Sequence, residues 1–470
     1  MSSKLAKEDN RKTEKRQKGK AQPALCRLAA LTLAAALSAG LMAGCSGSRS
    51  ASGDGAKDAS GQQSGDAGKD EKVTIEYWQY QYPVKVDLIN SLIKEFEKTH
   101  PNITVKQTNF PYDQYNEKVA TLIPAGKGPD VINLYYGWLP KYTASGYLQP
   151  LPKESFPDSK IKEEFFPFVE AAQIGGSYYA IPTAVRTLGL YYNKDLFAKA
   201  GLDPAKPPAT WEELVDYSKK LTEKDAKGEF VVEGMAWQPN SQLHHWYRDA
   251  LVYQASGKDI SEDRKRVLWN ETPAGLEAFK YLLDFATVHK VGTKDFYNDD
   301  ITAFKGGHAA MNIDGSFQLG GLKKDAPNLN FAVAPLPAYK GKATQASFWA
   351  NGITKNAKGK KLEAATEFLK FLTSKEVQEQ WVEKVGELPA SKAVALQDKY
   401  SKDEKIGPFI RQLGDANAHF FVDEKLERDY FVQAADSVVL NKVPAEKAFE
   451  ELVAKTQKLY DDYWAKQAKK

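Results

Sequence analysis

An alternation of strand and helix patterns constrains the fold of this chain more than any other feature. Apolar and polar residues alternate over 73–78, apolar residues recur at helical spacing over 88–96, and alternation returns over 103–105. A second helical pattern over 112–123 leads into an apolar run over 131–134. Right-handed crossovers between consecutive strands would turn this β-α-β-α-β order into an open parallel sheet. The sequence therefore predicts an α/β fold.

Aromatic and amide side chains follow each of the three predicted strands. They lie within residues 79–82, 110–112 and 135–138. Ligands of open α/β sheets bind beyond the carboxyl ends of the strands. Core packing alone does not account for three such strand ends, so we predict a ligand-binding site there.

Further strand and helix patterns fill the rest of the chain. Residues 210–213 form a capping box before an amphipathic helix, and Pro273 begins a second helix. Residues 309–317 are typical of a strand, a turn and a helix start, and 330–334 of another strand, while the C-terminal third has mainly helical spacing. From residue 73 onwards there are roughly 400 residues, which is enough for two lobes.

The start of the chain carries the signals of export and membrane attachment. Lys and Arg crowd residues 1–20, and the uncharged stretch 28–43 is shorter than the roughly 20 residues that a membrane-spanning helix needs. Small residues precede Cys45, and a segment rich in Gly, Ser, Asp and Lys follows it. The arrangement resembles the lipobox of bacterial lipoproteins, in which the cysteine is lipidated and becomes the mature N-terminus. We expect a signal peptide over 1–44 and a flexible tether over 45–72, the alternative being an uncleaved anchor with an incidental cysteine.

Cysteine and charge counts exclude several classes of function. The two cysteines are Cys26, in the predicted signal peptide, and Cys45, so the folded part has no thiol for a disulfide, a zinc site or a nucleophile. The formal charge of +4 is misleading, because the first 44 residues hold nine Lys and Arg but three Asp and Glu. The rest of the chain has 56 basic and 58 acidic residues, a net charge of −2. A basic nucleic-acid surface is therefore not expected.

Short motifs spread along the chain match one family of proteins. In order, they are Phe96-Glu-Lys-Thr-His-Pro101, Gly128-Pro-Asp-Val131, Ala180-Ile-Pro182, Leu190-Tyr-Tyr-Asn-Lys-Asp-Leu196, Ala310-Met311 with Gly315, Gly352-Ile353, Ala364-Ala365, Phe368-Leu-Lys-Phe-Leu372 and Leu388-Pro389. In the order and spacing of these motifs, residues 73–470 resemble the family 1 extracellular solute-binding proteins, the lipid-anchored or periplasmic receptors of carbohydrate ABC importers.

The resemblance implies a two-lobed periplasmic-binding-protein fold of type II, with discontinuous α/β lobes joined by a hinge. One lobe would comprise 73–185 and 348–385, and the other 186–347 and 386–470. The implied function is to capture a sugar, in the first place an oligosaccharide, and to deliver it to a membrane permease that a cytoplasmic ATPase drives. The protein would be a monomer on the extracytoplasmic face of the cell membrane, held there by the palmitate-bearing lipid on Cys45.

A sugar needs aromatic rings against its apolar face and hydrogen-bonding side chains around its hydroxyl rim. Matching the family's positions onto this chain gives the candidate ligand-binding residues Gln79, Tyr136, Arg186, Trp237, Trp246, Asp314, Phe317, Trp349, Asn351 and Tyr430. Core packing is the alternative for each aromatic residue among them. Phe317 falls where maltose-binding relatives carry Trp, so the identity of the sugar does not transfer. Asp130 is a weaker candidate, because a Pro-Asp motif also supports a strand end structurally.

Arg186 stands where maltose-binding relatives place a Glu that contacts the ligand. A guanidinium group binds a carboxylate through two parallel hydrogen bonds, so this exchange points to an acidic oligosaccharide. Two further interpretations remain open. Arg186 could hydrogen-bond neutral hydroxyls, or it could pair with a protein carboxylate such as Asp314 or Glu387.

Neither an enzyme nor a cofactor or metal site is predicted. The sequence has no Gly-x-Ser-x-Gly motif and no phosphate-binding P-loop. His244-His245 is the one metal-like pair, and adjacent residues rarely both face one ion. A lipid-anchored glycosidase or polysaccharide lyase stays possible, because paired carboxylates are recognised by their spatial separation. A structural surface lipoprotein and a receptor for a non-sugar solute are also compatible with the sequence.

Overall fold

The computed structural model of the protein describes residues 72–239 and 242–468. Its first elements are β1 (Val73–Tyr80), α1 (Pro83–Thr99), β2 (Ile103–Phe110), α2 (Tyr112–Leu122) and β3 (Val131–Tyr135). β1 lies between β2 and β3 and is parallel to both. The predicted β-α-β-α-β order with parallel strands is therefore confirmed.

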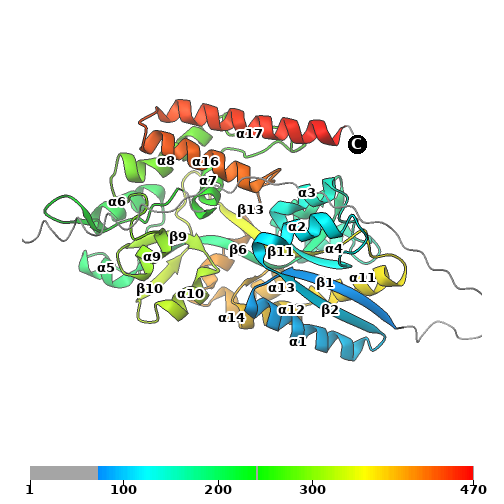
Figure 1. The fold of residues 1–470 in the computed structure, drawn as a ribbon. Helices are drawn as coiled ribbons and strands as arrows, with labels where there is room; N and C mark the ends of the chain where they lie inside the picture. The colour runs from blue at the N-terminus through cyan, green and yellow to red at the C-terminus, as the bar shows by residue number, and fades with distance from the viewer. Residues whose placement is uncertain (1–71, 240–241, 469–470) are drawn as a thin grey trace, which may run out of the picture. The chain divides into compact units, whose positions relative to one another are not determined.

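Two long strands extend this sheet in the antiparallel direction. β11 (Thr344–Ile353) pairs with β3, and the first part of β6 (Ala180–Asn193) pairs with β11. The second part of β6 pairs with β9 (Met311–Gly315) and β10 (Phe331–Ala334), both antiparallel to it. Figure 1 shows β6 running from the side of β1 to the side of β9 and β10. The expected parallel sheet is thus one part of a larger mixed sheet.

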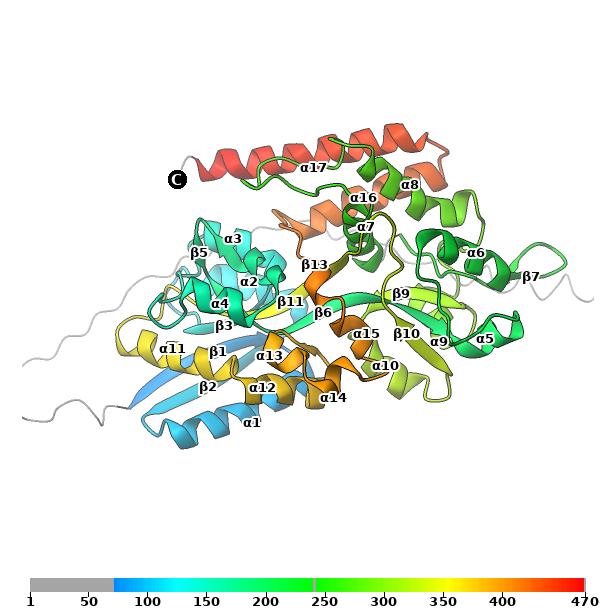
Figure 2. The ribbon, with the colours of Figure 1, turned by 180° about the vertical axis from the view of Figure 1, so that it is seen from behind.

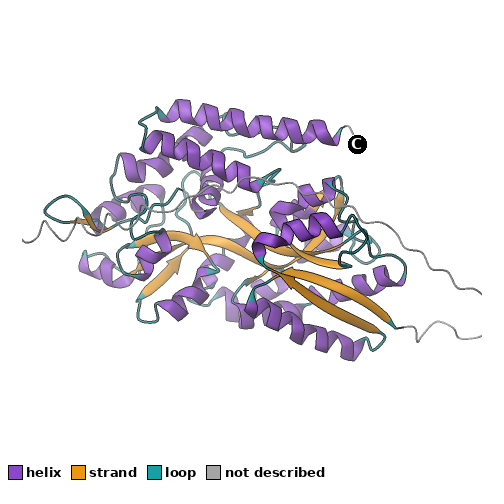
Figure 3. Ribbon diagram, viewed as in Figure 1, coloured by secondary structure: helices purple, strands orange, loops and turns teal. Residues whose placement is uncertain are grey.

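Helices lie on both sides of the strands, as Figure 3 shows. α1 packs against β2, and α11 (Lys360–Leu372) packs against β1. At the C-terminus, α16 (Glu424–Val439) and α17 (Ala445–Gln467) pack on each other and on α8 (Ala274–Thr287) (Figure 2). The C-terminal third is mainly helical, as predicted. In the part of the chain that the structure describes, none of the helices has both the length and the apolar character to cross a bilayer.

The predicted capping box begins α6 (Trp211–Leu221) with one difference. Thr210 Oγ1 accepts a hydrogen bond from the Glu213 backbone N–H at 3.2 Å, as the motif predicts. The Glu213 carboxylate, however, accepts from the backbone N–H of Ala209 at 2.7 Å rather than from Thr210. The helix start is therefore confirmed, and the reciprocal bond is shifted by one residue.

Shorter elements complete the fold. They are α3 (Leu139–Ala144), α4 (Asp158–Glu164), α5 (Lys194–Lys199), α7 (Gln242–Gln254), α9 (Asp300–Lys305), α10 (Gln318–Asp325), α12 (Lys375–Gln380), α13 (Lys392–Ala395), α14 (Asp398–Ser401), α15 (Gly407–Ile410), β4 (Gln173–Ile174), β5 (Ser177–Tyr178), β7 (Glu223–Lys224), β8 (Phe230–Val232), β12 (Leu388–Pro389) and β13 (Ala416–Asn417).

The turn before β12 positions a charged residue against β6. Gly386 has a φ of 78°, a left-handed conformation that glycine adopts without steric strain. After this turn, Leu388 and Pro389 pair with Val185 and Ala184 of β6. The backbone between them, at residue 387, is thereby held beside the middle of the mixed sheet.

Candidate functional site

Five aromatic side chains gather near the carboxyl ends of β1, β2 and β3, and we call Tyr80, Tyr82, Tyr112, Trp138 and Trp349 the aromatic cluster. The ring of Trp349 lies 4.3 Å from that of Tyr80 and 5.5 Å from that of Trp138, measured between centroids. The Tyr112 ring is 5.8 Å from both Tyr80 and Trp138. Tyr82 and Tyr112 are 47% and 52% exposed, whereas Trp349 is buried. Two rings of the cluster, those of Tyr82 and Tyr112, are therefore exposed to solvent, while the ring of Trp349 is buried.

Strand register brings these rings together. Tyr80 and Phe110 stand opposite each other at the ends of β1 and β2. Tyr135, at the end of β3, stands opposite Trp349 of β11. Because neighbouring parallel strands end at the same edge of the sheet, the aromatic residues that follow them meet there. The convergence predicted from three strand ends is confirmed.

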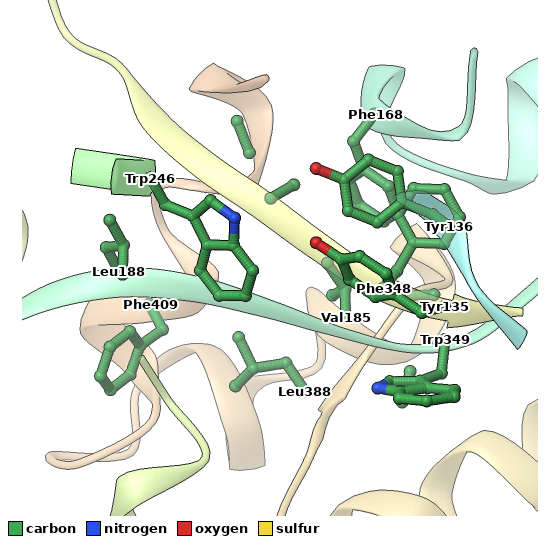
Figure 4. Close-up of a cluster of buried hydrophobic side chains, with 14 of the residues drawn as sticks. Tyr135, Tyr136, Phe168, Val185, Leu188, Trp246, Phe348, Trp349, Leu388 and Phe409 are labelled. Carbon is green, nitrogen blue, oxygen red and sulfur yellow. The ribbon is translucent and has the colours of Figure 1, made fainter. Parts of the chain in front are cut away.

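A second aromatic group adjoins the cluster and contains two of the predicted residues, Tyr136 and Trp246 (Figure 4). The ring of Tyr135 lies 6.0 Å from Trp349 and 6.5 Å from Trp246 of α7, and its hydroxyl is on the side toward Trp246. Tyr136 stacks on Phe348 with centroids 4.7 Å apart. Trp246 is buried, and its indole Nε1 has no hydrogen-bond partner among the described residues. A buried unpaired donor costs about 1–3 kcal/mol, so this N–H is suited to a ligand hydroxyl or a water.

Three charged residues, which we call the charged triad, lie beside the aromatic cluster: Lys85, Arg186 and Glu387. Lys85 Nζ is 2.8 Å from Glu387 Oε1. Arg186 donates to the same oxygen through Nε, at 2.9 Å, and through Nη2. The Arg186 guanidinium carbon also lies 4.9 Å from the ring centroid of Phe317. Arg186 pairs with a protein carboxylate, that of Glu387, as one of its three interpretations predicted, and its contacts with a ligand stay a prediction.

The triad shifts the pKa of its members. Burial alone would raise the pKa of Glu387, but the charges of Arg186 and Lys85 outweigh burial and lower that pKa to about 2. Burial lowers the pKa of Lys85 to about 8, although the Glu387 carboxylate opposes the shift. At neutral pH all three groups are therefore charged, and two cations share one carboxylate.

The other predicted polar residues lie deeper in the sheet. Gln79 is fully buried and donates from Nε2 to the Gln107 side chain. Asn351 is also fully buried, and its Oδ1 accepts from the Tyr77 hydroxyl at 3.0 Å and from Asn133 Nδ2 at 3.1 Å. Both are part of the core beneath the aromatic cluster. The Gln79 Oε1 and Asn351 Nδ2 atoms have no hydrogen-bond partner among the described residues.

Asp314 and Asp130 each support a strand. Asp314 is fully buried on β9, where its Oδ1 accepts from the Gly315 backbone N–H at 2.6 Å. Burial, reinforced by the Asp300 carboxylate, raises the pKa of Asp314 well above its usual value. Asp130 accepts from the Glu76 backbone N–H at 2.9 Å and pairs with Lys361 at 3.1 Å, which agrees with a structural role for the Pro-Asp motif.

Two predicted aromatic residues lie near helices of the second half of the sheet. Trp237 is buried, and its Nε1 donates to the backbone oxygen of Leu282 on α8 at 2.8 Å. Tyr430 is half-buried on α16. Within the described ranges, neither has a ring contact with the aromatic cluster. Cys45 and the side chains of His244 and His245 lie outside the described residues.

A buried group of charged residues is the other notable polar feature, and we call it the His419 cluster. His419 contacts Asp259 through Nδ1 and Glu427 through Nε2, the latter at 2.7 Å. Asp249, paired with Arg248, completes a set of groups with the spacing of a metal site. Burial would lower the pKa of His419, but the Asp259 and Glu427 charges raise it well above its usual value. A protonated imidazole ring can donate from both nitrogens, which fits its contacts with the two carboxylates.

Sequence reasoning missed Lys85 as a site residue and did not select four members of the aromatic cluster. Tyr80, Tyr82, Tyr112 and Trp138 all lie in the strand ends that the pattern singled out, but no family position pointed to them individually. Lys85 had one detectable signal. It stands in the first turn of a helix that Pro83 begins, where the helix dipole disfavours a cation.

Comparison with known proteins agrees with this architecture. The profile of the bacterial extracellular solute-binding proteins matches residues 91–408. The maltotriose-binding protein of Pyrococcus abyssi is 28% identical over 360 residues, which cover 74% of this chain and 72% of that protein. The sn-glycerol-3-phosphate-binding periplasmic protein of Pectobacterium atrosepticum is 27% identical over 365 residues, or 74% of this chain and 79% of that protein.

A solved structure supports the fold independently. The cyclic α-maltosyl-1,6-maltose binding protein of Arthrobacter globiformis has a TM-score of 0.75 at 22% identity, over 83% of this chain and 100% of that one. The predicted two-lobed periplasmic-binding-protein fold is thereby confirmed. Since the family profile covers most of the described residues, the chain belongs to the bacterial extracellular solute-binding proteins.

Proposed function

We propose that the protein is the receptor of an ABC importer and captures a carbohydrate, in the first place an oligosaccharide, outside the cell. The aromatic cluster carries this proposal, because its exposed rings suit the apolar face of a pyranose and the polar residues beside and beneath it suit the hydroxyl rim. The maltotriose-binding relative supports a saccharide. The receptor would pass its solute to a membrane permease, which a cytoplasmic ATPase drives.

Binding without chemical change is the test of this proposal. Isothermal titration against a panel of neutral and acidic oligosaccharides should find a saccharide that binds in the micromolar range or tighter. Product analysis after long incubation should recover that saccharide intact. Recovery of shorter or unsaturated products would instead support a carbohydrate-active enzyme. Binding of non-sugar solutes alone would contradict the proposal that the ligand is a carbohydrate.

The two lobes would close around the solute by hinge bending. We place the lobe boundaries at residues 185/186, 347/348 and 385/386, where β6, β11 and the turn before β12 lie side by side in the sheet. Closure of this kind rotates two bodies about a few backbone positions. Small-angle scattering should therefore show a smaller radius of gyration at saturation with sugar than without it. An unchanged radius would contradict the hinge.

Exposed rings of the aromatic cluster give the sharpest test of the binding surface. Tyr82→Ala and Tyr112→Ala should each weaken sugar binding by about 1 kcal/mol, which is roughly fivefold, because each removes a stacking face. Both side chains are about half exposed, so the melting temperature should stay close to that of the parent protein. Tyr339→Ala is the matched control, since Tyr339 is 44% exposed and hydrogen-bonds Glu277, outside the cluster.

Of the three tryptophans predicted to stack on a sugar, we keep two as candidates. Trp349 belongs to the aromatic cluster, and Trp246 stacks next to it with its N–H unpaired among the described residues. Trp237 is better explained by core packing against α8, where its N–H is satisfied. We propose Tyr136, Arg186 and Phe317 as neighbours of the bound solute, and Gln79, Asp314, Asn351 and Tyr430 as residues that hold the surrounding structure.

The receptor would be anchored by a lipid on Cys45, with cleavage between Gly44 and Cys45. A tether of about 27 residues reaches on the order of 30 Å as a random coil, which lets the receptor approach a membrane permease. Cys45→Ser should abolish lipid labelling and release the protein into the medium or leave the precursor uncleaved. Fractionation and metabolic labelling with palmitate would measure this. An unchanged amount of protein in the membrane fraction would contradict lipidation at Cys45.

A further inference from the structure

The charged triad carries more positive than negative charge. Lys85 and Arg186 contact the same oxygen of Glu387, so two cations share one carboxylate. Their side chains are 1%, 21% and 3% exposed for Lys85, Arg186 and Glu387. Charge that is removed from water without a full counter-charge is unfavourable. An anion bound beside the triad would neutralise the excess.

The start of α1 adds to this positive field. α1 spans 17 residues, its N-cap residue Tyr82 provides no side-chain hydrogen bond, and its first turn contains no acidic residue. The N-terminus of a helix is its positive end, and its first backbone N–H groups have no intrahelical acceptor. Lys85 places a further cation in this turn, where stability alone favours Asp or Glu. The local charges are thus arranged for an anion and against the stability of the helix end.

The Lys85 ammonium group points into the aromatic cluster. Its Nζ lies 5.4 Å from the ring centroid of Tyr80, 5.9 Å from that of Tyr82 and 5.3 Å from that of Trp349. The ion pair with Glu387 is its one close polar contact in the described structure, and no hydrogen bond of good geometry is formed. Because Lys85 itself is 1% exposed, an acceptor would have to approach its ammonium group past the half-exposed ring of Tyr82.

Arg186 offers further donors at the same place. Its Nε and Nη2 donate to Glu387, and its Cζ lies over the Phe317 ring. A guanidinium has five N–H donors in one plane, and it binds carboxylate and phosphate oxygens in that plane. With 21% of its side chain exposed, Arg186 is the most exposed member of the triad.

We infer that the solute carries an anionic group, a carboxylate or a phosphate, which binds to Lys85 and Arg186 at the first turn of α1 while the rest of the solute lies on the aromatic cluster. The inference rests on the proposed function, because it takes the aromatic cluster as the solute site. It narrows the solute to a saccharide acid or a phosphorylated polyol or sugar.

Matched pairs of probes test the inference with the purified full-length protein in detergent. Trigalacturonic acid is compared with its methyl ester, and sn-glycerol 3-phosphate with glycerol, while maltotriose serves as a neutral saccharide. We expect an anionic member of one pair to bind at least tenfold tighter than its neutral counterpart. The affinity of that member should fall as NaCl rises from 50 to 500 mM, since the ion pairing is partly solvent-exposed. The pair that responds distinguishes a carboxylate from a phosphate.

Charge-removing variants locate the effect. Arg186→Gln and Lys85→Met should each reduce binding of the anionic probe at least tenfold and should remove its preference over the neutral partner. Lys94→Gln is the matched control, because it removes one positive charge from an exposed position of α1 away from the triad. Circular dichroism identifies a variant that fails to fold. In that case the salt dependence of anionic-probe binding to the parent protein tests the inference in place of the variant.

The outcomes separate this inference from the proposed function. Tight binding of maltotriose or the methyl ester, with no preference for an anionic probe, overturns the inference and leaves the carbohydrate receptor in place. Preference for sn-glycerol 3-phosphate without binding of any saccharide supports the inference that the solute is anionic. It overturns the proposal that the solute is a carbohydrate. Equal losses in Arg186→Gln and Lys94→Gln would show a general charge effect and overturn the assigned site.

Discussion

Glu387→Gln is expected to lower the free energy of unfolding by about 3–5 kcal/mol, measured by urea denaturation at pH 7. The substitution leaves the buried Lys85 and the partly buried Arg186 without their shared counter-charge. Glu383→Gln is the matched control, because Glu383 is 58% exposed and its ion pair with Lys399 is solvated. That control should change stability by less than about 0.5 kcal/mol.

The effect of Glu387 should also depend on pH in a defined direction. Its pKa of about 2 in the folded protein lies below the ordinary value of 4.5, so the carboxylate stabilises the fold at pH values above 4.5. That contribution is lost as pH falls from about 4.5 toward 2. The stability difference between the parent protein and Glu387→Gln should therefore shrink over this range. A difference that stays constant down to pH 3 would show that the ion pairs are not its cause.

His419→Gln is expected to destabilise the protein by about 3–5 kcal/mol as well, because it leaves the buried Asp259 and Glu427 carboxylates without the positive charge between them. The pKa of His419 is raised in the folded protein, so its contribution is full below the unfolded value of about 6.5 and is lost as pH rises through the folded value. The difference from the parent protein should be largest near pH 6 and should decrease at alkaline pH.

A matched control and a metal assay accompany this second prediction. His289→Gln replaces a half-buried histidine outside the His419 cluster and should change stability by less than about 1 kcal/mol. Elemental analysis of the purified protein should find no stoichiometric cation, because a protonated His419 that contacts two carboxylates offers no free ring nitrogen to an ion. A bound ion together with a melting temperature that falls in chelator would contradict the protonated cluster.

Local patterns predicted much of the fold because they depend on neighbouring residues. The order of β1, α1, β2, α2 and β3, and the aromatic residues at the strand ends, follow from periodicity over short segments. The antiparallel pairing of β6 with β11 could not be predicted in this way. It joins segments more than 150 residues apart, and a strand's sequence does not identify its distant partner.

The candidate site shows the same limit at the level of single residues. The aromatic cluster could be predicted as a region, since four of its five members follow predicted strands, while Trp349 lies on β11. The ion pair between Arg186 and Glu387 was one of several open interpretations. It depends on the pairing of β12 with β6, which places residue 387 beside Arg186. The core position of Trp237 depends on a hydrogen bond to Leu282, which no local pattern encodes.

The position of β11 in the sheet has a consequence for biosynthesis. β3 ends at Tyr135, but its antiparallel neighbour β11 ends at Ile353, and α11, which packs on β1, follows still later. At 5–20 residues per second, a ribosome needs on the order of 10–40 s to synthesise the intervening chain. During this time the edge of β3 has no partner strand, so the sheet that contains β1 and β3 stays incomplete until residue 353 has been made. The N-terminal strands therefore depend on a segment more than 200 residues further along the chain before their sheet can close.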